Sequence, residues 1–391
     1  LLVTPLCATP QTRSILKGYF ETGDTPTQAQ FENLIDSLSN TSNNWQLLTS
    51  TAVGDTSVVL DRPASPIVVN SLIIIDPFTI NAEVRSVSAI SSATITVTAL
   101  KKAHTAGCQI LSIDGQSVSV ELYGALGNTS DDEPEIQAAL DDQWVNAGTY
   151  WLSGRNRFYR TFKPLILSSA AKIEHINFKA DATYAPVGAD NAMLMPSQGN
   201  VLTFTAGTDD VITTPSAHGL PSDNVKVMFK NITGMAGITA GQIYYCRDRT
   251  TTTFKVSATS GGAVVDITSS GSGTTYCEIN SMSRIYMRDV YIDGSSVAGI
   301  TGMYAFLQQP ADIWKLRIGN CPLVGLKLGG QDGTFYNVML INNGVGLAMD
   351  NASFFKFYQF NVEQCQTGVT MTTNCPSNLF DGVHMELNSG S

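Results

Sequence analysis

A pattern that recurs every 21 to 26 residues near the end of the printed sequence constrains the fold more than any other feature of these 391 residues. Each unit has a short apolar run followed by turn residues, and the steps between units are 26, 23, 21 and 23 residues. Repeats of this length are typical of solenoids, in which each unit buries its apolar face only against its neighbours. A strand, a Gly or Asn turn and a second strand in each unit predict a parallel β-helix. The anchors are Ile292, Ile318, Ile341, Val362 and Met385.

Small residues follow three of these anchors at the same distance. Cys321, Gly344 and Cys365 each lie three positions after an anchor, which predicts a stacked ladder of small residues in the core. We interpret the two thiols as core packing and not as reactive groups. The other cysteines and the four histidines are scattered, without CxxC or HExxH spacing, so we expect no disulfide framework, no metal site and no cofactor.

One helix with clear start signals precedes the repeats. It is predicted over residues 132–146 and has an apolar stripe. A stack of parallel strands ends in unpaired backbone groups and an open core, and repeat proteins cover that end with an atypical cap. We therefore predict that this helix is the cap, that the first strand of the stack starts at Gly148, and that the segment from Lys172 is another coil. The stripe comprises Ile136, Ala139, Leu140 and Trp144.

The remaining segments divide the chain into modules. Residues 51–112 and 201–279 are β-branched runs broken by Gly, Pro and Ser turns, which indicates two small β modules. Near the N-terminus, Thr25, Pro26 and Gln28 mark the start of a short helix. Its apolar stripe packs either against copies of itself or against the next domain. The predicted fold is mainly β: an N-terminal helical segment (1–48), a small β-barrel or sandwich (49–115), the cap and first coils (116–200), an inserted β module (201–279) and further coils (280–391).

Composition and charge exclude several classes of partner. The net charge is −10, and no stripe of Lys and Arg exists to displace counterions from phosphates, which argues against nucleic acid. No apolar run approaches the roughly 20 residues of a membrane helix, so we expect no membrane insertion. The opening "LLVTPLCATP" lacks the features of a signal peptide. Because the first residue is not Met and "MELNSGS" lies within the repeat pattern, we expect a longer natural chain.

The sequence around the predicted cap resembles a known family. "YGALGNTSDDEPEIQAALDD" at residues 123–142, followed by "AGTYWLS", is similar to the opening sequence of pectate-lyase-like β-helix domains in bacteriophage tailspikes. The segment "SILKGYFETGDTPTQAQFENLIDSL" resembles an N-terminal segment of tail-fibre and tailspike proteins, and both β modules resemble small units found in them. The matching positions at the cap are Gly124, Gly127, Asp131, Asp132, Ile136, Gln137, Ala138, Ala139, Gly148, Thr149 and Tyr150.

This resemblance implies a function and a set of partners. It implies a right-handed β-helix in a homotrimer on the virion tail, with the N-terminal part bound to tail, baseplate or portal-adapter proteins. The β-helix would recognise and depolymerise a host surface polysaccharide. Two alternatives remain: a non-enzymatic receptor-binding or adapter tail fibre protein, and a secreted bacterial β-helix adhesin, which the missing signal sequence disfavours. The inserted module must project from the stack, and an active site beyond Ser391 remains open.

A pair of carboxylates carries the chemical prediction. Glycoside hydrolysis needs two carboxyl groups, about 5 to 5.5 Å apart for retention and 6.5 to 9.5 Å for inversion. Adjacent coils of a β-helix lie about 4.8 Å apart. Glu363 and Glu386 each follow an anchor on neighbouring coils, with Asp381 and His384 close in sequence. Repulsion between the two charges favours one of them staying protonated as the acid. We therefore predict Glu363, Glu386 and Asp381 as catalytic candidates, against the alternative that they are solvated turn residues.

Other chemistry has weaker support. A lyase would need a base with Arg or Lys partners on one face, and Arg317 and Lys327 show no stacked arrangement in the sequence. Aromatic residues such as Trp314 and Tyr336 offer flat surfaces for sugars. The dense aromatic run at residues 354–360 is predicted to pack mostly in the core and between subunits.

Overall fold

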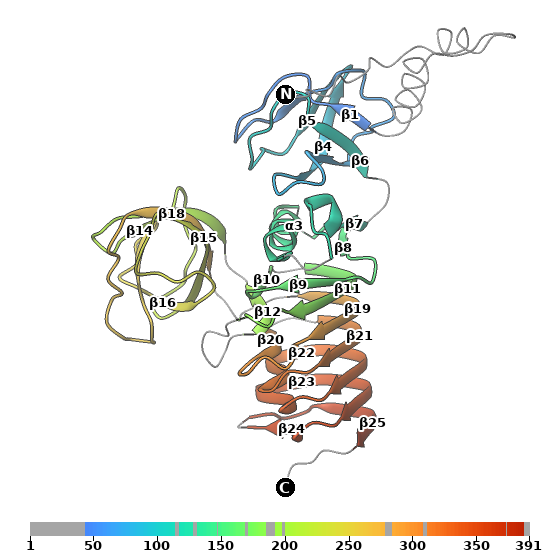
Figure 1. Cartoon of the computed structure of the whole chain (residues 1–391), viewed down its shortest axis with the longest axis vertical. Coiled ribbons are helices and arrows are strands. Elements are labelled where there is room, and N and C mark those ends of the chain that lie inside the picture. Colours follow the sequence, from blue (N-terminus) through green and yellow to red (C-terminus); the bar gives the residue numbers. More distant parts are fainter. Residues whose placement is uncertain are drawn as a thin grey trace, which may run out of the picture. The chain divides into compact units, whose positions relative to one another are not determined.

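The computed structural model describes residues 44–113, 117–127, 131–146, 148–168, 171–184, 192–197, 200–277, 284–307, 311–372 and 374–386 (Figure 1). The chain divides into two compact units, residues 1–115 and 116–391. The predicted N-terminal helix and nearly all of the segment 1–48 lie outside the described residues.

The described part of the first unit is a six-stranded antiparallel sheet in the order β1-β6-β3-β4-β5-β2. An isolated bridge between Leu47 and Leu60 joins the chain next to β1 and β2, the two edge strands. The sheet therefore curls around its own core, in which Trp45, Ile73 and Ile95 are buried. The strands are β1 (Asn44–Gln46), β2 (Ser57–Val59), β3 (Leu72–Ile75), β4 (Glu83–Ser91), β5 (Thr94–Val97) and β6 (Gln109–Ile113).

A charged cluster is buried in this module. Glu83, Arg85 and His104 have fully buried side chains, and the Glu83 carboxylate pairs with the Arg85 guanidinium. The same carboxylate lies 2.7 Å from Nε2 of His104 and accepts the Lys101 N–H at 3.0 Å. Burial alone would raise the pKa of Glu83, but the His104 hydrogen bond and the charge of Arg85 hold it below its usual value. The cluster thus compensates charges that would be costly to bury singly.

The predicted cap helix is confirmed as α3 (Glu133–Val145). Ile136, Ala139 and Leu140 are buried, and the helix packs against strands at the start of the β-helix. The carboxylate of Asp132 accepts the N–H groups of Leu126 at 2.7 Å and Arg160 at 3.2 Å, which ties the preceding loop to the first coils.

The prediction that the stack starts at Gly148 is wrong. β7 (Ser117–Ser119) precedes a short 3-10 helix (Val120–Tyr123) and α3 in the chain, yet it pairs in parallel with β8 (Trp151–Ser153). Three residues are too few to show an alternation of period two, so this strand could not be recognised from the sequence.

The parallel β-helix is confirmed, with all its strand pairs parallel in two columns (Figure 1). Two long strands, β22 (Val324–Ile341) and β23 (Val345–Glu363), contribute to both columns. One column contains β8, β9 (Phe158–Thr161), β11 (Ala171–Ala180), β19 (Ile285–Asp293), β21 (Ala311–Gly319), the second halves of β22 and β23, and β25 (Leu379–Glu386). The other contains β10 (Leu165–Ser168), β12 (Ala192–Ser197), β20 (Thr301–Leu307), the first halves of β22 and β23, and β24 (Thr367–Met371).

One anchor of the predicted repeat is displaced by a residue. Ile318 pairs with Leu340, and Leu340 with Val362, so the third anchor is Leu340 and not Ile341. Leu340 is buried whereas Ile341 is partly exposed. Both residues are apolar and adjacent, so the sequence could not show which of them points inward.

The same displacement changes the predicted small-residue ladder. Its middle member is Asn343 and not Gly344, because Asn343 lies three residues after Leu340. The buried Asn343 side chain accepts the N–H of Cys321 at 3.0 Å and donates to the carbonyl of Ile318 at 3.2 Å. Cys321 and Cys365 are fully buried, and burial raises the pKa of both thiols. Both are core residues, as predicted.

A residue with a left-handed backbone conformation recurs at one register position of the column that contains β8, β9 and β11. In this conformation the chain bends, and the strand continues as a second segment with its own inward-facing residues. Each coil therefore presents two outward surfaces that flank the bend. The left-handed residues are His175, Asp289, Lys315, Asn337, Gln359 and Gly382, with φ between 50° and 68°.

A closed antiparallel barrel interrupts the β-helix between β12 and β19, in the order β13-β14-β17-β16-β15-β18. Phe229 packs against Phe204, Tyr244 and Phe254 in its core. The strands are β13 (Val201–Ala206), β14 (Ile212–Thr213), β15 (Lys226–Thr233), β16 (Ile243–Arg247), β17 (Thr253–Ser257) and β18 (Gly271–Cys277).

Hydrogen bonds and an ion pair join the barrel to the cap helix. Glu133, Gln137 and Asp141 are spaced four residues apart and lie on one face of α3. Lys230 of the barrel donates to the carboxylate of Glu133 and, at 2.9 Å, to Oε1 of Gln137. The Tyr276 hydroxyl donates to Asp141 at 2.9 Å. An apolar cluster of Ile166, Ala192, Met195, Met228 and Tyr276 completes this contact.

Candidate functional site

Glu363 and Glu386 lie on adjacent coils at the same register, as Cα partners on β23 and β25. Their register column continues to the preceding coil through Ile341, which is the partner of Glu363. Glu363 is partly buried and Glu386 is exposed. The two carboxylates therefore belong to neighbouring positions on one outward surface.

β25 adds two more polar groups. Nε2 of His384 lies 3.2 Å from a carboxylate oxygen of Glu386, and both side chains are more than half exposed. Asp381 is also exposed, but it lies before the left-handed residue Gly382, whereas His384 and Glu386 lie after it. Asp381 therefore belongs to the other outward surface of this coil, and the structure does not place it in the column of the two glutamates.

An aromatic column leads to Asp381. Trp314, Tyr336 and Tyr358 are register partners on three successive coils, and Tyr358 is in turn the partner of Asp381. Their rings are stacked, with centroids 4.0 Å apart for the first pair and 5.0 Å for the second. Trp314 is 45% exposed, and its ring nitrogen donates to Asp312 at 2.6 Å. The neighbouring rings cover both faces of Tyr336, so this column offers mainly ring edges and hydroxyl groups to a ligand.

The aromatic run at residues 354–360 packs mostly in the core, as predicted. Phe355, Phe357 and Phe360 are fully buried. Phe357 stacks on Phe335 of the preceding coil and Phe380 of the next, with centroids 4.9 and 4.8 Å apart. These rings lie on the same strand as Tyr358 of the aromatic column. They differ from it because their side chains point into the core, whereas that of Tyr358 points outward.

The two cations considered for a lyase lie in different columns. The Arg317 guanidinium stacks over the ring of Tyr291 at 4.9 Å, in the register column that leads to His384. Lys327 lies over Tyr304 at 4.6 Å in the other strand column. The structure therefore does not bring Arg317 and Lys327 together as a lyase site would require.

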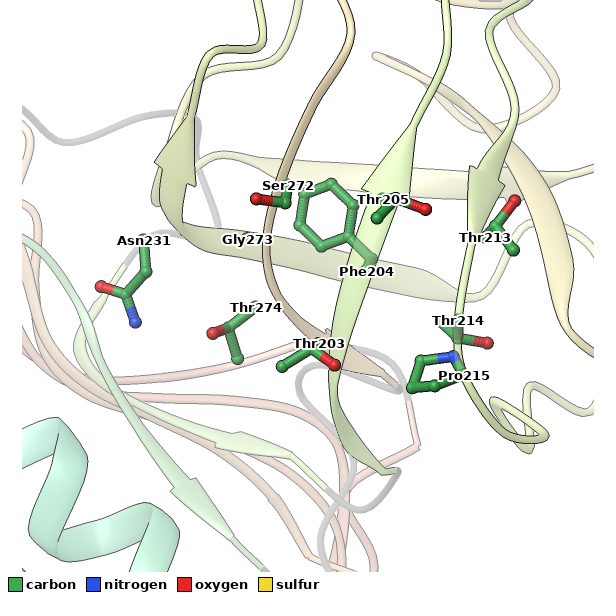
Figure 2. A pocket seen from close by; sticks show the side chains of 10 residues that line it. All are labelled: Thr203, Phe204, Thr205, Thr213, Thr214, Pro215, Asn231, Ser272, Gly273 and Thr274. Atoms are coloured by element: carbon green, nitrogen blue, oxygen red, sulfur yellow. The ribbon is translucent and has the colours of Figure 1, made fainter. Parts of the chain in front are cut away.

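A cleft in the inserted barrel was not predicted from the sequence. It has a volume of about 480 Å³ and is lined by side chains of β13, β15 and β18 and by the chain around β14 (Figure 2). Its lining contains Thr203, Thr205 and Thr274 and no ionisable side chain. The alternating threonines of β13 were the only sequence signal, and they are equally typical of any exposed strand.

The described residues show neither a metal-binding group nor a membrane-spanning helix. No group of three or more His, Cys, Asp or Glu side chains in them is arranged to hold a metal ion. None of their helices is long and apolar enough to cross a membrane.

Comparison with known proteins finds similarity only among solved structures. No family model matches the chain, and no curated protein does. A putative glycosyl hydrolase from Parabacteroides merdae is 9% identical with a TM-score of 0.39, over 69% of this chain and 98% of that one. The tailspike gp49 from Pseudomonas phage LKA1 is 11% identical, with a TM-score of 0.30, over 69% of this chain and 55% of its own.

The full-length tailspike protein 2 from the Escherichia coli O157:H7 bacteriophage CAB120 is 11% identical, with a TM-score of 0.28, over 93% of this chain and 47% of its own. This chain thus spans about half the length of the two tailspikes. It is a β-solenoid that is similar to phage tailspike structures. What it binds has to be argued from its own residues.

Proposed function

We propose that this chain is part of a phage tailspike whose β-helix binds a host surface polysaccharide along the coils of β21, β22, β23 and β25. The observation that carries this proposal is the aromatic column of Trp314, Tyr336 and Tyr358, which ends at Asp381. Aromatic edges provide apolar area, while the hydroxyl and carboxylate groups can bond sugar hydroxyls. Equivalent groups recur on each coil, about 4.8 Å apart, and such a periodic surface suits a polymer lying along the stack.

Cleavage of the bound polymer is the finer part of the proposal. The spacing of adjacent coils, about 4.8 Å, is close to the carboxyl separation of about 5 to 5.5 Å in retaining glycosidases. Glu363, the less exposed of the pair, would protonate the glycosidic oxygen. Glu386, beside His384, would attack the anomeric carbon. A water molecule that gives its proton to Glu363 would then release the sugar from Glu386 and restore the acid. Asp381 would contact the sugar from the neighbouring surface.

Binding can be tested with Trp314→Leu and Tyr336→Leu in the full-length protein. We expect both to weaken retention of the protein by host surface glycan in affinity electrophoresis by about fivefold or more, since losing roughly 40 Å² of apolar contact with the sugar costs about 1 kcal/mol. The control is Phe354→Leu, which changes an exposed ring outside the column. Equal retention of all three variants and the unchanged protein would place the glycan elsewhere.

The alternative is a receptor-binding or adapter protein without catalysis. One observation favours it: the side chains of Glu386 and His384 are 57% and 55% exposed, which is the exposure of a solvated surface pair. Binding of host glycan without any release of reducing ends by the full-length protein would support this alternative over cleavage.

Attachment to the virion is proposed for residues 1–48, with tail, baseplate or portal-adapter proteins as partners. The support is the resemblance of this segment to those of tail proteins. Removing residues 1–43, which leaves β1 and the buried Trp45 of the first module in place, should give particles that lack the protein in immunoblots of purified virions, while its expression level stays the same. Normal incorporation of the truncated protein would refute the assignment.

A further inference from the structure

The cleft in the inserted barrel is bordered by an array of hydroxyl groups. Thr203 pairs with Thr274 and Thr205 with Ser272 across β13 and β18, and Thr205 pairs with Thr213 of β14. Residues at alternate positions point to the same side of a sheet, so these side chains share the outer surface of the barrel. Thr203, Thr205, Thr213 and Ser272 are exposed and Thr274 is partly exposed. Figure 2 shows them around the cleft.

None of these hydroxyl groups forms a hydrogen bond within the described part of the chain. The side chains of Thr203, Thr205, Thr213, Ser272 and Thr274 have no hydrogen-bond partner among the described residues. Neighbouring strands lie about 4.8 Å apart, and residues on one side of a strand recur about every 7 Å. The array therefore offers several hydroxyl groups, each able to donate and to accept a hydrogen bond, to one ligand that lies across the two strands.

A β-bulge turns an amide toward the cleft. The pairing of β15 with β18 shifts register between Lys230 and Thr233, and Asn231 within this bulge has a left-handed φ of 51°. Lys230 points to the cap helix, whereas Asn231 is exposed and lines the cleft. A bulge re-aims a side chain in this way. Figure 2 places Asn231 at one end of the group of lining residues and Thr213 at the other.

Gly273 allows the bulge to approach β18. A Cβ atom at this position would lie 2.8 Å from the carbonyl oxygen of Lys230 and 2.8 Å from the ring of Phe204. Both distances are too short for a side chain, so the wall of the cleft depends on glycine here. The cleft is therefore formed by specific features of β15 and β18, and not by exposed threonines alone.

The lining determines the chemical class of the ligand. It has no charged residue, although the chain contains 33 acidic and 23 basic residues. A charged ligand would find no counter-charge, and an apolar ligand would leave the hydroxyl and amide groups without partners. We propose that this cleft binds a neutral saccharide through the hydroxyl array and Asn231, with Pro215 as an apolar contact. This site is independent of the glycan-binding surface proposed on the β-helix.

The test uses the whole chain and a panel of neutral probes. Methyl glycosides of glucose, galactose, mannose and N-acetylglucosamine are examined by saturation-transfer NMR, with glucuronate as the charged comparison. We expect at least one neutral glycoside to bind and glucuronate not to bind. The double variant Thr203→Val, Thr274→Val keeps the β-branched shape and removes two hydroxyl groups, and should weaken binding about fivefold or more.

The control and the opposing outcomes separate this site from others. Thr251→Val removes an exposed hydroxyl of the same barrel that does not line the cleft, and should leave binding unchanged. If the double variant does not fold, Asn231→Gly tests the site, because glycine accepts the left-handed conformation. Binding that survives these variants, binding lost only in Trp314→Leu, binding of glucuronate, or binding of no neutral glycoside would each overturn the proposal.

Discussion

The carboxyl group of Asp141 should lower the stability of the second unit at neutral pH. It lies on the face of α3 that contacts the barrel, and burial raises its pKa from 3.8 to about 6, against the lowering effect of hydrogen bonds from Gln137 and Tyr276 and the charge of Lys230. Because the folded state holds this proton more tightly, stability falls as pH rises from about 4 to 6 and stays reduced above that range. A rise of about two pKa units corresponds to roughly 3 kcal/mol. This value is an upper limit because the residue is only partly buried.

Asp141→Asn removes the charge and keeps the hydrogen bonds. Its oxygen can still accept from Nε2 of Gln137, which lies 2.9 Å from Oδ1 of Asp141. Its NH₂ group can donate to the Tyr276 hydroxyl oxygen, since a phenol both donates and accepts. We therefore expect the variant to unfold at higher urea concentration at pH 7.5, with a gain of up to about 3 kcal/mol. The gain should disappear as the pH approaches 4.

The measurement is urea unfolding followed by circular dichroism at pH 7.5 and 4.5. Asp332→Asn is the matched control, because Asp332 is exposed and its left-handed backbone, with φ of 67°, suits asparagine. We expect no change in that control at either pH. A loss of stability in Asp141→Asn, or a gain that is equal at both pH values, would refute the reasoning.

Three further predictions concern catalysis, the first module and assembly. Glu363→Gln and Glu386→Gln should each abolish release of reducing ends from host glycan by the full-length protein and change stability by no more than about 0.5 kcal/mol; unaltered cleavage by both would move the active site elsewhere. Glu83→Gln should destabilise the first module by about 3 to 5 kcal/mol, since it leaves Arg85 buried without its counter-charge, and a calorimetric transition at the original temperature would contradict this. The chain is expected to be a homotrimer, and a monomer mass in light scattering at micromolar concentration would exclude it.

The sequence by itself determined the β-helix and its cap, because both have a local periodicity. Each coil buries alternate residues against the next, so the inward residues recur along the chain wherever the coils have similar length. α3 was visible for the same reason, since its apolar residues follow the helical period. The period located the third anchor only to within one residue, because Leu340 and Ile341 are both apolar. The adjacency of Glu363 and Glu386 was also predictable, since the two residues lie one repeat of 23 residues apart in the sequence.

The tertiary structure alone decided which side chains meet across the coils and the barrel. The stacking of Trp314 on Tyr336 depends on the exact length of one coil and on the bend at its left-handed residue. Lys230 reaches Glu133 across 97 residues of sequence, and the barrel cleft combines Thr203 with Thr274. Such contacts leave no period in the sequence, because they join residues that only the complete fold brings together. Outward-facing residues are also free of the packing constraint that makes inward ones recognisable, so the sequence does not reveal the candidate binding surfaces.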